Sequence, residues 1–111
     1  MRTVRLLITC AGGDSMPALI KCLRCSDNFN YILIGVDGVS AGKSKDVLDV
    51  YYQVPNGSDI EYSDKLLEVA LKENIDFIMP YSDEEAISIS SNIKKFNDKG
   101  ILVIVSDHNV L

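Results

Sequence analysis

Short apolar runs alternate along this chain with longer segments whose apolar residues recur at helical spacing. Runs of about four to eight apolar residues between turn residues are typical of buried strands. The sequence predicts five strands, at residues 4–9, 31–36, 50–54, 76–79 and 101–105. Turn residues close several of them, as Pro55-Asn56-Gly57 does after the third strand and Pro80 after the fourth.

Helical spacing predicts three helices between these strands. Two begin with a serine followed three residues later by a glutamate, the pattern of a capping box, at Ser58 with Glu61 and at Ser82 with Glu85. The helices cover residues 15–25, 58–74 and 82–100, with core positions Met16, Leu19, Ile20 and Leu23, then Leu66, Leu67, Ala70 and Leu71, then Ala86, Ile89, Ile93 and Phe96. Between the second and third strands, residues 38–46 are expected to be irregular, with one short helical turn near Ser44.

The strand pattern indicates a parallel sheet covered by helices on both faces. Strands 4–9, 31–36 and 101–105 are continuously apolar, which is typical of strands buried on both sides. Right-handed crossovers then give an α/β, Rossmann-like three-layer sandwich with a five-stranded parallel sheet in the order 3-2-1-4-5. Ligands of such sheets bind at the carboxyl ends of the strands. The candidate segments are therefore residues 10–15, 37–45, 80–85 and 107–108.

Length and charge narrow the function classes. The 111 residues predict one domain, residues 1–111. A net charge of −5 argues against nucleic acid as a partner, since phosphate binding needs a basic face. No apolar run approaches the roughly 20 residues of a membrane span, and the first residues lack the pattern of a secretion signal. Three cysteines are too few for a disulfide framework, so we expect a reduced, cytoplasmic protein without membrane partners.

The turn after the first strand contains Gly12, Gly13, Asp14 and Ser15 and opens a helix. Glycines permit a sharp turn, and a helix N-terminus presents free N–H groups to a ligand. A dinucleotide fingerprint would need a third glycine where Met16 stands, although Asp37 ends the second strand where a ribose-binding acid would lie. We therefore favour a turn with substrate contacts over nicotinamide or flavin binding. The remaining alternative is a tight turn in which Asp14 or Ser15 only caps the helix.

Three other motifs predict no chemistry of their own. The segment Gly38-Val39-Ser40-Ala41-Gly42-Lys43-Ser44 imitates a phosphate loop, but three residues separate its glycines instead of four, and we interpret it as a solvated loop. Cys22 and Cys25 lie at the C-terminal end of a helix, where a redox or zinc pair is not favoured, so they are expected to be buried or half-buried free thiols. His108 is the single histidine, which excludes metal sites built from several histidines of this chain.

The second informative motif follows the fourth strand. Ser82, Asp83, Glu84 and Glu85 place three acids in the first turn of a helix at the ligand edge. Ordinary capping, with acids favoured by the helix dipole, is the alternative interpretation.

Taken together, several segments resemble the N-terminal, pre-ATP-grasp domain of ATP-grasp ligases, closest to the carbamoyl-phosphate-synthase-like group. The resemblance covers essentially the whole chain and departs from the family pattern at Cys10 and Met16, where glycine is common. The matching segments are Leu7-Ile8-Thr9-Cys10-Ala11-Gly12-Gly13-Asp14-Ser15, Ile34-Gly35-Val36-Asp37, Tyr51-Tyr52-Gln53-Val54-Pro55, Ile75-Asp76-Phe77-Ile78-Met79-Pro80-Tyr81-Ser82-Asp83-Glu84-Glu85 and Val103-Ile104-Val105-Ser106-Asp107.

The resemblance implies either one domain of a longer ligase or an orphaned domain of that kind. Such enzymes use ATP and magnesium to form an acyl phosphate that a nitrogen nucleophile attacks. The ATP-binding core follows this domain, and it is the expected partner of this one; the 111 residues alone are expected to be inactive, to hold no cofactor or metal and to carry no catalytic residue. The residues expected to contact a small-molecule substrate are Gly12, Gly13, Asp14, Ser15, Ser82, Asp83 and Glu84, with Asp37 flanking them.

Other interpretations remain open. A stand-alone Rossmann-type nucleotide- or cofactor-binding module is the main alternative to a ligase domain. A receiver-like interaction domain is disfavoured, because Cys10-Ala11 and Pro55-Asn56 stand where its acidic residues belong. An apolar face left without its core domain could also pair two copies in a homo-oligomer.

Overall fold

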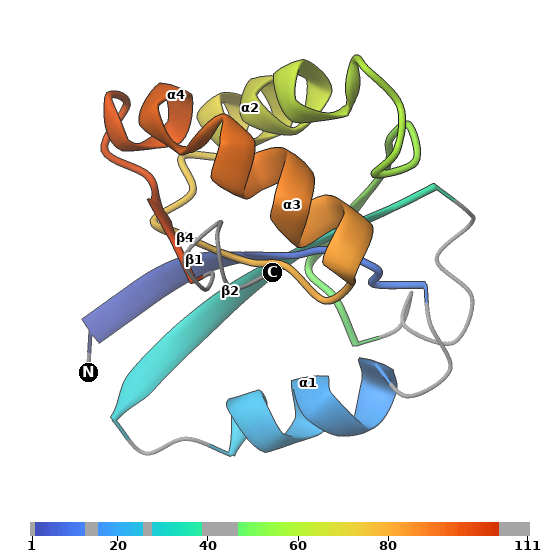
Figure 1. Cartoon of the computed structure of the whole chain (residues 1–111). Coiled ribbons are helices and arrows are strands. Elements are labelled where there is room, and N and C mark those ends of the chain that lie inside the picture. Colours follow the sequence, from blue (N-terminus) through green and yellow to red (C-terminus); the bar gives the residue numbers. More distant parts are fainter. Residues whose placement is uncertain (1, 13–15, 26–27, 39–46, 105–111) are drawn as a thin grey trace.

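Five parallel strands form the centre of the molecule (Figure 1). The computed structural model describes residues 2–12, 16–25, 28–38 and 47–104. Within them the elements are β1 (Arg2–Ile8), α1 (Met16–Arg24), β2 (Phe29–Asp37), β3 (Val50–Gln53), α2 (Tyr62–Lys72), β4 (Phe77–Met79), α3 (Asp83–Ser91), α4 (Ile93–Asn97) and β5 (Leu102–Val103). The sheet order is β3-β2-β1-β4-β5, which confirms the predicted topology.

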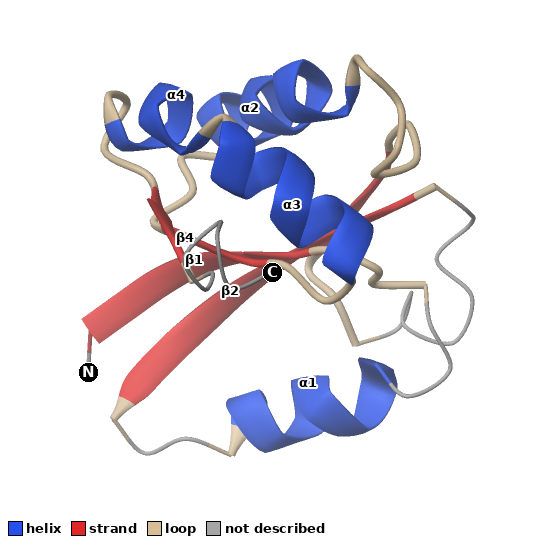
Figure 2. Ribbon diagram, viewed as in Figure 1, coloured by secondary structure: helices blue, strands red, loops and turns tan. Residues whose placement is uncertain are grey.

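Helices cover the sheet unequally (Figure 2). Helices α2, α3 and α4 lie on one face and α1 lies on the other. Side chains of β1 alternate between the two sides: Leu7 packs in the core beneath α2, α3 and α4, whereas Leu6 and Ile8 pack in the core beside α1. Burying each such aliphatic side chain contributes about 1.5–3 kcal/mol. The continuous apolar pattern of β1 therefore reflects two cores, one on each face.

The third predicted helix is divided in two. Asn92 separates α3 from α4, and its side-chain amide donates a hydrogen bond to the carbonyl of Ser88 at 2.8 Å. Serine and asparagine compete in this way with helical backbone bonds. The apolar spacing continues across the break, and Ile89 and Phe96 are both fully buried. The periodicity was thus satisfied by two helices packed on one core.

Some predicted positions are wrong. Helix α2 begins after Glu61, with no side-chain cap, so the proposed Ser58 capping box does not form; instead Asp59 accepts a hydrogen bond from the N–H of Glu61 at 2.8 Å. Leu71 is exposed rather than part of the core. Strand β5 is not buried on both faces, because it is an edge strand and α1 does not reach over it: Leu102 is 55% exposed.

The two helix-end cysteines also differ from expectation. Cys22 and Cys25 are both exposed free thiols rather than buried ones. Cys22 lies in the last turn of α1, and Cys25 directly follows the last residue of that helix, Arg24. The predicted helical turn near Ser44, Lys43 in the same loop, and His108 fall outside the described residues.

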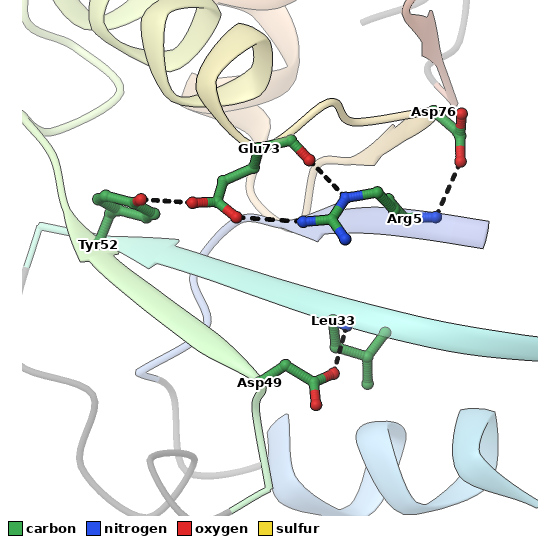
Figure 3. A network of polar contacts seen from close by, with 6 residues as sticks. All are labelled: Arg5, Leu33, Asp49, Tyr52, Glu73 and Asp76. Carbon is green, nitrogen blue, oxygen red and sulfur yellow. Dashed lines mark hydrogen bonds and ion pairs between the residues drawn. The ribbon is translucent and has the colours of Figure 1, made fainter. Parts of the chain in front are cut away.

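A polar network fixes the end of α2 against the sheet (Figure 3). The guanidinium of Arg5 pairs with the carboxylate of Glu73 at 3.2 Å, and the hydroxyl of Tyr52 donates to the other oxygen of that carboxylate. The backbone N–H of Arg5 donates to Asp76 at 2.9 Å. The hydrogen bond to Glu73 raises the pKa of Tyr52. These contacts satisfy polar groups at the helix end and join β1, β3 and the approach to β4.

Within the described residues, no helix is long and apolar enough to cross a membrane.

Candidate functional site at the carboxyl edge of the sheet

The loop after β1 is tied to the strands on both sides of it. The N–H of Thr9 donates to the carbonyl of Met79 at 3.2 Å, and the N–H of Ala11 donates to Val36 at 3.1 Å. The buried hydroxyl of Thr9 in turn accepts from the N–H of Tyr81 at 2.8 Å. These bonds bring the ends of β1, β2 and β4 together at one edge. The start of the loop after β1 and the loop that begins at Pro80 therefore lie at the same edge of the sheet.

A buried carboxylate stands where these loops meet. Glu85 is 5% exposed. One of its oxygens accepts hydrogen bonds from the Cys10 thiol at 3.1 Å and from the Ser82 hydroxyl at 2.9 Å. Ser82 also caps α3, as predicted, by accepting from the N–H of Glu85 at 3.4 Å. In the described part of the chain, no lysine or arginine forms a salt bridge with Glu85.

The Cys10 thiol is held in its neutral form. Burial, the hydrogen bond to Glu85 and the negative charge of that residue raise the pKa of Cys10 to about 12. A thiol with this pKa is a hydrogen-bond donor at neutral pH and a poor nucleophile. Cys10 also adopts a positive φ of 54°, a conformation rare outside glycine and asparagine. Glycine, which is common at this position in the family pattern, would form the turn without strain. Cys10 instead adds a thiol that donates a hydrogen bond.

Asp37 folds back onto the glycine turn. Its carboxylate accepts from the N–H of Gly12 at 3.0 Å and from the N–H of Gly38 at 2.7 Å. In dinucleotide-binding turns, backbone N–H groups of this kind face the pyrophosphate. Here the Gly12 donor is already bound by an internal anion, and this places negative charge at the turn.

The loop after β3 closes the site from the side. Gly57 lies so close to the start of α3 that an added Cβ would stand 2.8 Å from Cγ and 3.0 Å from N of Glu85. A Cβ added at Gly38 would stand closer still to the side-chain oxygen of Asn56. Together the four loops enclose a pocket of about 160 Å³, lined by Cys10, Asp37, Gly38, Asn56, Gly57, Ser58, Ser82, Glu84 and Glu85.

Tyr62 is fully buried and carries a hydroxyl without a close partner. It is the first residue of α2, and its hydroxyl has no hydrogen-bond partner among the described residues. Burial, followed by the negative charge of Glu85 and an interaction of the hydroxyl with the Glu85 side chain too long for an ordinary hydrogen bond, raises the pKa of Tyr62. Cys10 and Asp37 act on it in the same direction. Tyr62 itself does not line the pocket.

The sequence-predicted residues are distributed unequally around this pocket. Asp37, Ser82 and Glu84 line it. Gly12 is held by Asp37 beside it, and Asp83 is exposed and does not line it. Gly13, Asp14 and Ser15 lie outside the described residues.

Sequence reasoning missed three features at this edge of the sheet. Cys10 and Glu85 were inside the candidate segments but were not selected. Cys10 was interpreted as a departure from the family pattern, and Glu85 as part of a helix capping box. The loop at residues 56–58 was not considered, although the rule that ligands bind at the carboxyl ends of parallel strands applies to β3 as well. Tyr62 had no signal in the sequence, since an apolar neighbourhood does not show which hydroxyl lacks a partner.

The described residues do not fit a metal or a nucleotide phosphate. Within them no group of three histidine, cysteine or acidic residues is arranged to hold a metal ion. The pocket lining contains three carboxylates and no lysine or arginine, whereas phosphates are bound by cationic side chains or free N–H groups.

Comparison with known structures supports the fold. The dTDP-glucose 4,6-dehydratase of Bacillus anthracis, solved in complex with NAD, matches with a TM-score of 0.63 and 17% identity. The match covers 90% of this chain and 36% of that one, so this chain spans about a third of the dehydratase. At this identity the likeness shows a Rossmann-like fold and carries no information about a ligand. A search of curated proteins found no match.

The residues that match a protein family span nearly the whole sheet. Residues 6–104 match the family described as "PylC-like, N-terminal domain", a domain typical of ATP-grasp ligases. These residues run from β1 to just past β5 and include all four loops of the pocket. The match confirms the resemblance to pre-ATP-grasp domains, and the chain belongs to the PylC-like N-terminal domain family.

Proposed function

We propose that this chain is the substrate-side domain of a carbamoyl-phosphate-synthase-like ATP-grasp ligase, which joins a carboxylate to an amine with ATP. The observation that carries the proposal is the polar pocket at the carboxyl edge, formed by four loops, whose described lining residues include no lysine or arginine. Family membership supports the ligase context. ATP and magnesium would be held by the core that follows in such ligases, since the residues described here do not fit them.

In this function the domain forms one side of the substrate site and carries out no chemical step itself. The tied loops after β1 and β4 hold the pocket rigid, because their backbone groups are already bonded to neighbouring strands. Rigid loops orient a bound acceptor toward a neighbouring domain with little entropic loss on binding. The core domain of the same protein is the proposed partner, and a small-molecule acceptor is the proposed ligand.

The experiment compares a longer chain containing an ATP-grasp core with the 111-residue chain. The longer chain should release ADP in the presence of magnesium, a carboxylate and an amine, and should release little when the amine is omitted. The 111-residue chain should show no heat of binding when titrated with magnesium-ATP. Micromolar binding of magnesium-ATP by the 111-residue chain would contradict the proposed division of labour.

The second candidate is a stand-alone dinucleotide-binding module, favoured by the likeness to a dehydratase that binds NAD. The contact between Asp37 and Gly12 argues against it, because a carboxylate occupies the N–H group that a pyrophosphate would need. Titration with NAD decides between them: saturable binding in the micromolar range would favour the dinucleotide module.

A further inference from the structure

Two thiols lie together at the end of α1, apart from the pocket. Cys22 and Cys25 are both exposed and free, one in the last turn of the helix and the other directly after it. Helix α1 follows β1 and leads back to the start of β2, so its end lies at the amino edge of the sheet, opposite the pocket (Figure 1). The proposed function does not use this pair.

The backbone at the helix end draws the two side chains toward each other. The N–H of Cys25 donates to the carbonyls of Cys22 and Lys21, each at 3.2 Å. The bond to Cys22 is of the 3₁₀ type, in which side chains three residues apart eclipse each other. In a regular α-helix the Cβ atoms of such a pair are about 5–6 Å apart, whereas a disulfide needs roughly 3.5–4.5 Å. Because Cys25 follows the last helical residue, its backbone can close the remaining gap without disturbing α1.

The end of α1 is anchored independently of the two thiols. The guanidinium of Arg24 donates to the carbonyls of Tyr31 and Val47, each at 2.9 Å. It also pairs with the carboxylate of Asp49 at 3.0 Å. These contacts hold the helix end against β2 and the segment before β3, so a bond between the thiols requires no movement of the sheet.

A small oxidant can reach this pair more readily than the third cysteine. Cys25 lines an open groove of about 540 Å³ between α1 and the segment before β3. The exposed Lys21 also lines it and offers a positive charge to an anionic oxidant. Cys10 lies at the opposite edge, and its pKa of about 12 leaves little thiolate to compete.

We propose that Cys22 and Cys25 form a reversible disulfide when the chain meets a small-molecule disulfide such as oxidised glutathione. The thiolate of Cys25 attacks one sulfur of the oxidant, which forms a mixed disulfide and releases one glutathione thiolate. The thiolate of Cys22 then attacks the Cys25 sulfur and releases the second. Each protein thiol gives up a proton, the two protein sulfurs together lose two electrons, and two molecules of reduced glutathione leave.

Mass spectrometry of the folded 111-residue chain, incubated with oxidised glutathione, tests the disulfide. The wild-type chain should lose the mass of two hydrogens, and dithiothreitol should restore it. After the free thiols are blocked with N-ethylmaleimide, trypsin cleaves behind Arg24 and places Cys22 and Cys25 on different peptides, which should stay joined until reduction. A lasting glutathione adduct, a disulfide that includes Cys10, or an unchanged mass would overturn the proposal.

Single variants separate pairing from exposure alone. Cys22→Ser and Cys25→Ser each leave one exposed thiol without its neighbour, so each should accumulate one glutathione adduct instead of losing two hydrogens. A single variant that still loses two hydrogens would show that Cys10 is a partner, and it would overturn the assignment of the pair. The ligase assay shares no measurement with this experiment, so the failure of one leaves the other in place.

Discussion

Cys10 shows how one residue can mark a site without being its nucleophile. Its strained backbone and its bond to Glu85 place the thiol on the pocket wall, while burial keeps it protonated. Cys22 and Cys25, by contrast, are exposed at the C-terminal end of α1 and just after it. The three thiols should therefore differ in chemistry although all three are reduced.

We expect a thiol reagent such as Ellman's reagent to distinguish them at pH 8. Cys22 and Cys25 should react fast, and Cys10 at least about 100-fold more slowly, because the thiolate is the reactive form and a pKa near 12 makes it rare. Cys10→Ser should remove the slow phase alone. Three equally fast thiols in the folded chain would show that Cys10 is neither shielded nor held protonated.

Tyr62 gives a prediction about stability. A buried hydroxyl without a partner destabilises a fold by about 1–3 kcal/mol, so Tyr62→Phe should raise the free energy of unfolding by about 1 kcal/mol. Tyr81→Phe, at an exposed tyrosine, is the control and should change it little. Urea denaturation measures both. A less stable Tyr62→Phe chain would mean that the hydroxyl has a partner within the fold.

At the scale of elements, the packing of the loop after β3 against the start of α3 requires the backbone of Gly57 to lie close to Glu85. A methyl group there would stand within 3.0 Å of two Glu85 atoms, one of them backbone. Gly57→Ala should destabilise the chain by about 1–3 kcal/mol, as overpacking does, whereas Ser58→Ala, at an exposed neighbour, should be nearly neutral. Thermal unfolding checks the pair. Equal stability of the two variants would mean that the loop can move away from the helix.

The strands and their order could be predicted from the sequence because each is a short apolar run bounded by turn residues, and crossover handedness leaves few topologies. The ends of the helices were harder to predict from the sequence. Ser58 and Ser82 begin the same motif, but only Ser82 caps a helix, since the turn at residues 56–61 uses Asp59 instead. Local pattern does not reveal which of two competing side chains bonds the backbone.

The site was predicted only in part for a similar reason. Edge position follows from topology, so Asp37 and Ser82 were placed in the pocket's neighbourhood from sequence. Burial of Glu85 and the approach of Gly57 depend on how the loop after β3 packs on α3, a contact between segments about 28 residues apart. Sequence pattern carries no such information.

For the whole molecule, unequal helix cover leaves one sheet face open beside α1. A groove of about 210 Å³ lies there, lined by Val4, Leu6, Leu23, Phe29, Tyr31, Phe77, Met79 and Ile104. Exposed apolar grooves of this kind promote association. We expect the 111-residue chain to pair with a second copy through this face, and more strongly at high salt, which screens its net charge of −5.

Light scattering over a concentration series tests this pairing. Ile104→Glu should lower the dimer fraction, because Ile104 is 56% exposed and lines the groove. Ile60→Glu adds the same charge at a residue that is 94% exposed and lies outside the groove, and it should leave the fraction unchanged. A wild-type chain that stays monomeric at high concentration and high salt would contradict the expectation.

Stability of the whole molecule should fall in alkaline solution. Burial and nearby carboxylates raise the pKa of Cys10 to about 12 and raise the pKa of Tyr62 as well. In the unfolded chain these groups lose their protons near pH 8.5 and 10, so above about pH 8.5 the unfolded state binds fewer protons than the folded state. The free energy of unfolding then decreases with rising pH.

Urea midpoints at pH 7.5 and 10.5 measure this effect. The wild-type midpoint should be lower at pH 10.5, because the folded chain keeps its buried protons while the unfolded chain has released them. The double variant Cys10→Ser, Tyr62→Phe should lose less of its midpoint between the two pH values, whereas Tyr81→Phe should lose as much as the wild type. An equal loss in the double variant would mean that other groups cause the alkaline sensitivity. It would also contradict the inference that burial and the Glu85 carboxylate keep Cys10 and Tyr62 protonated in the folded chain.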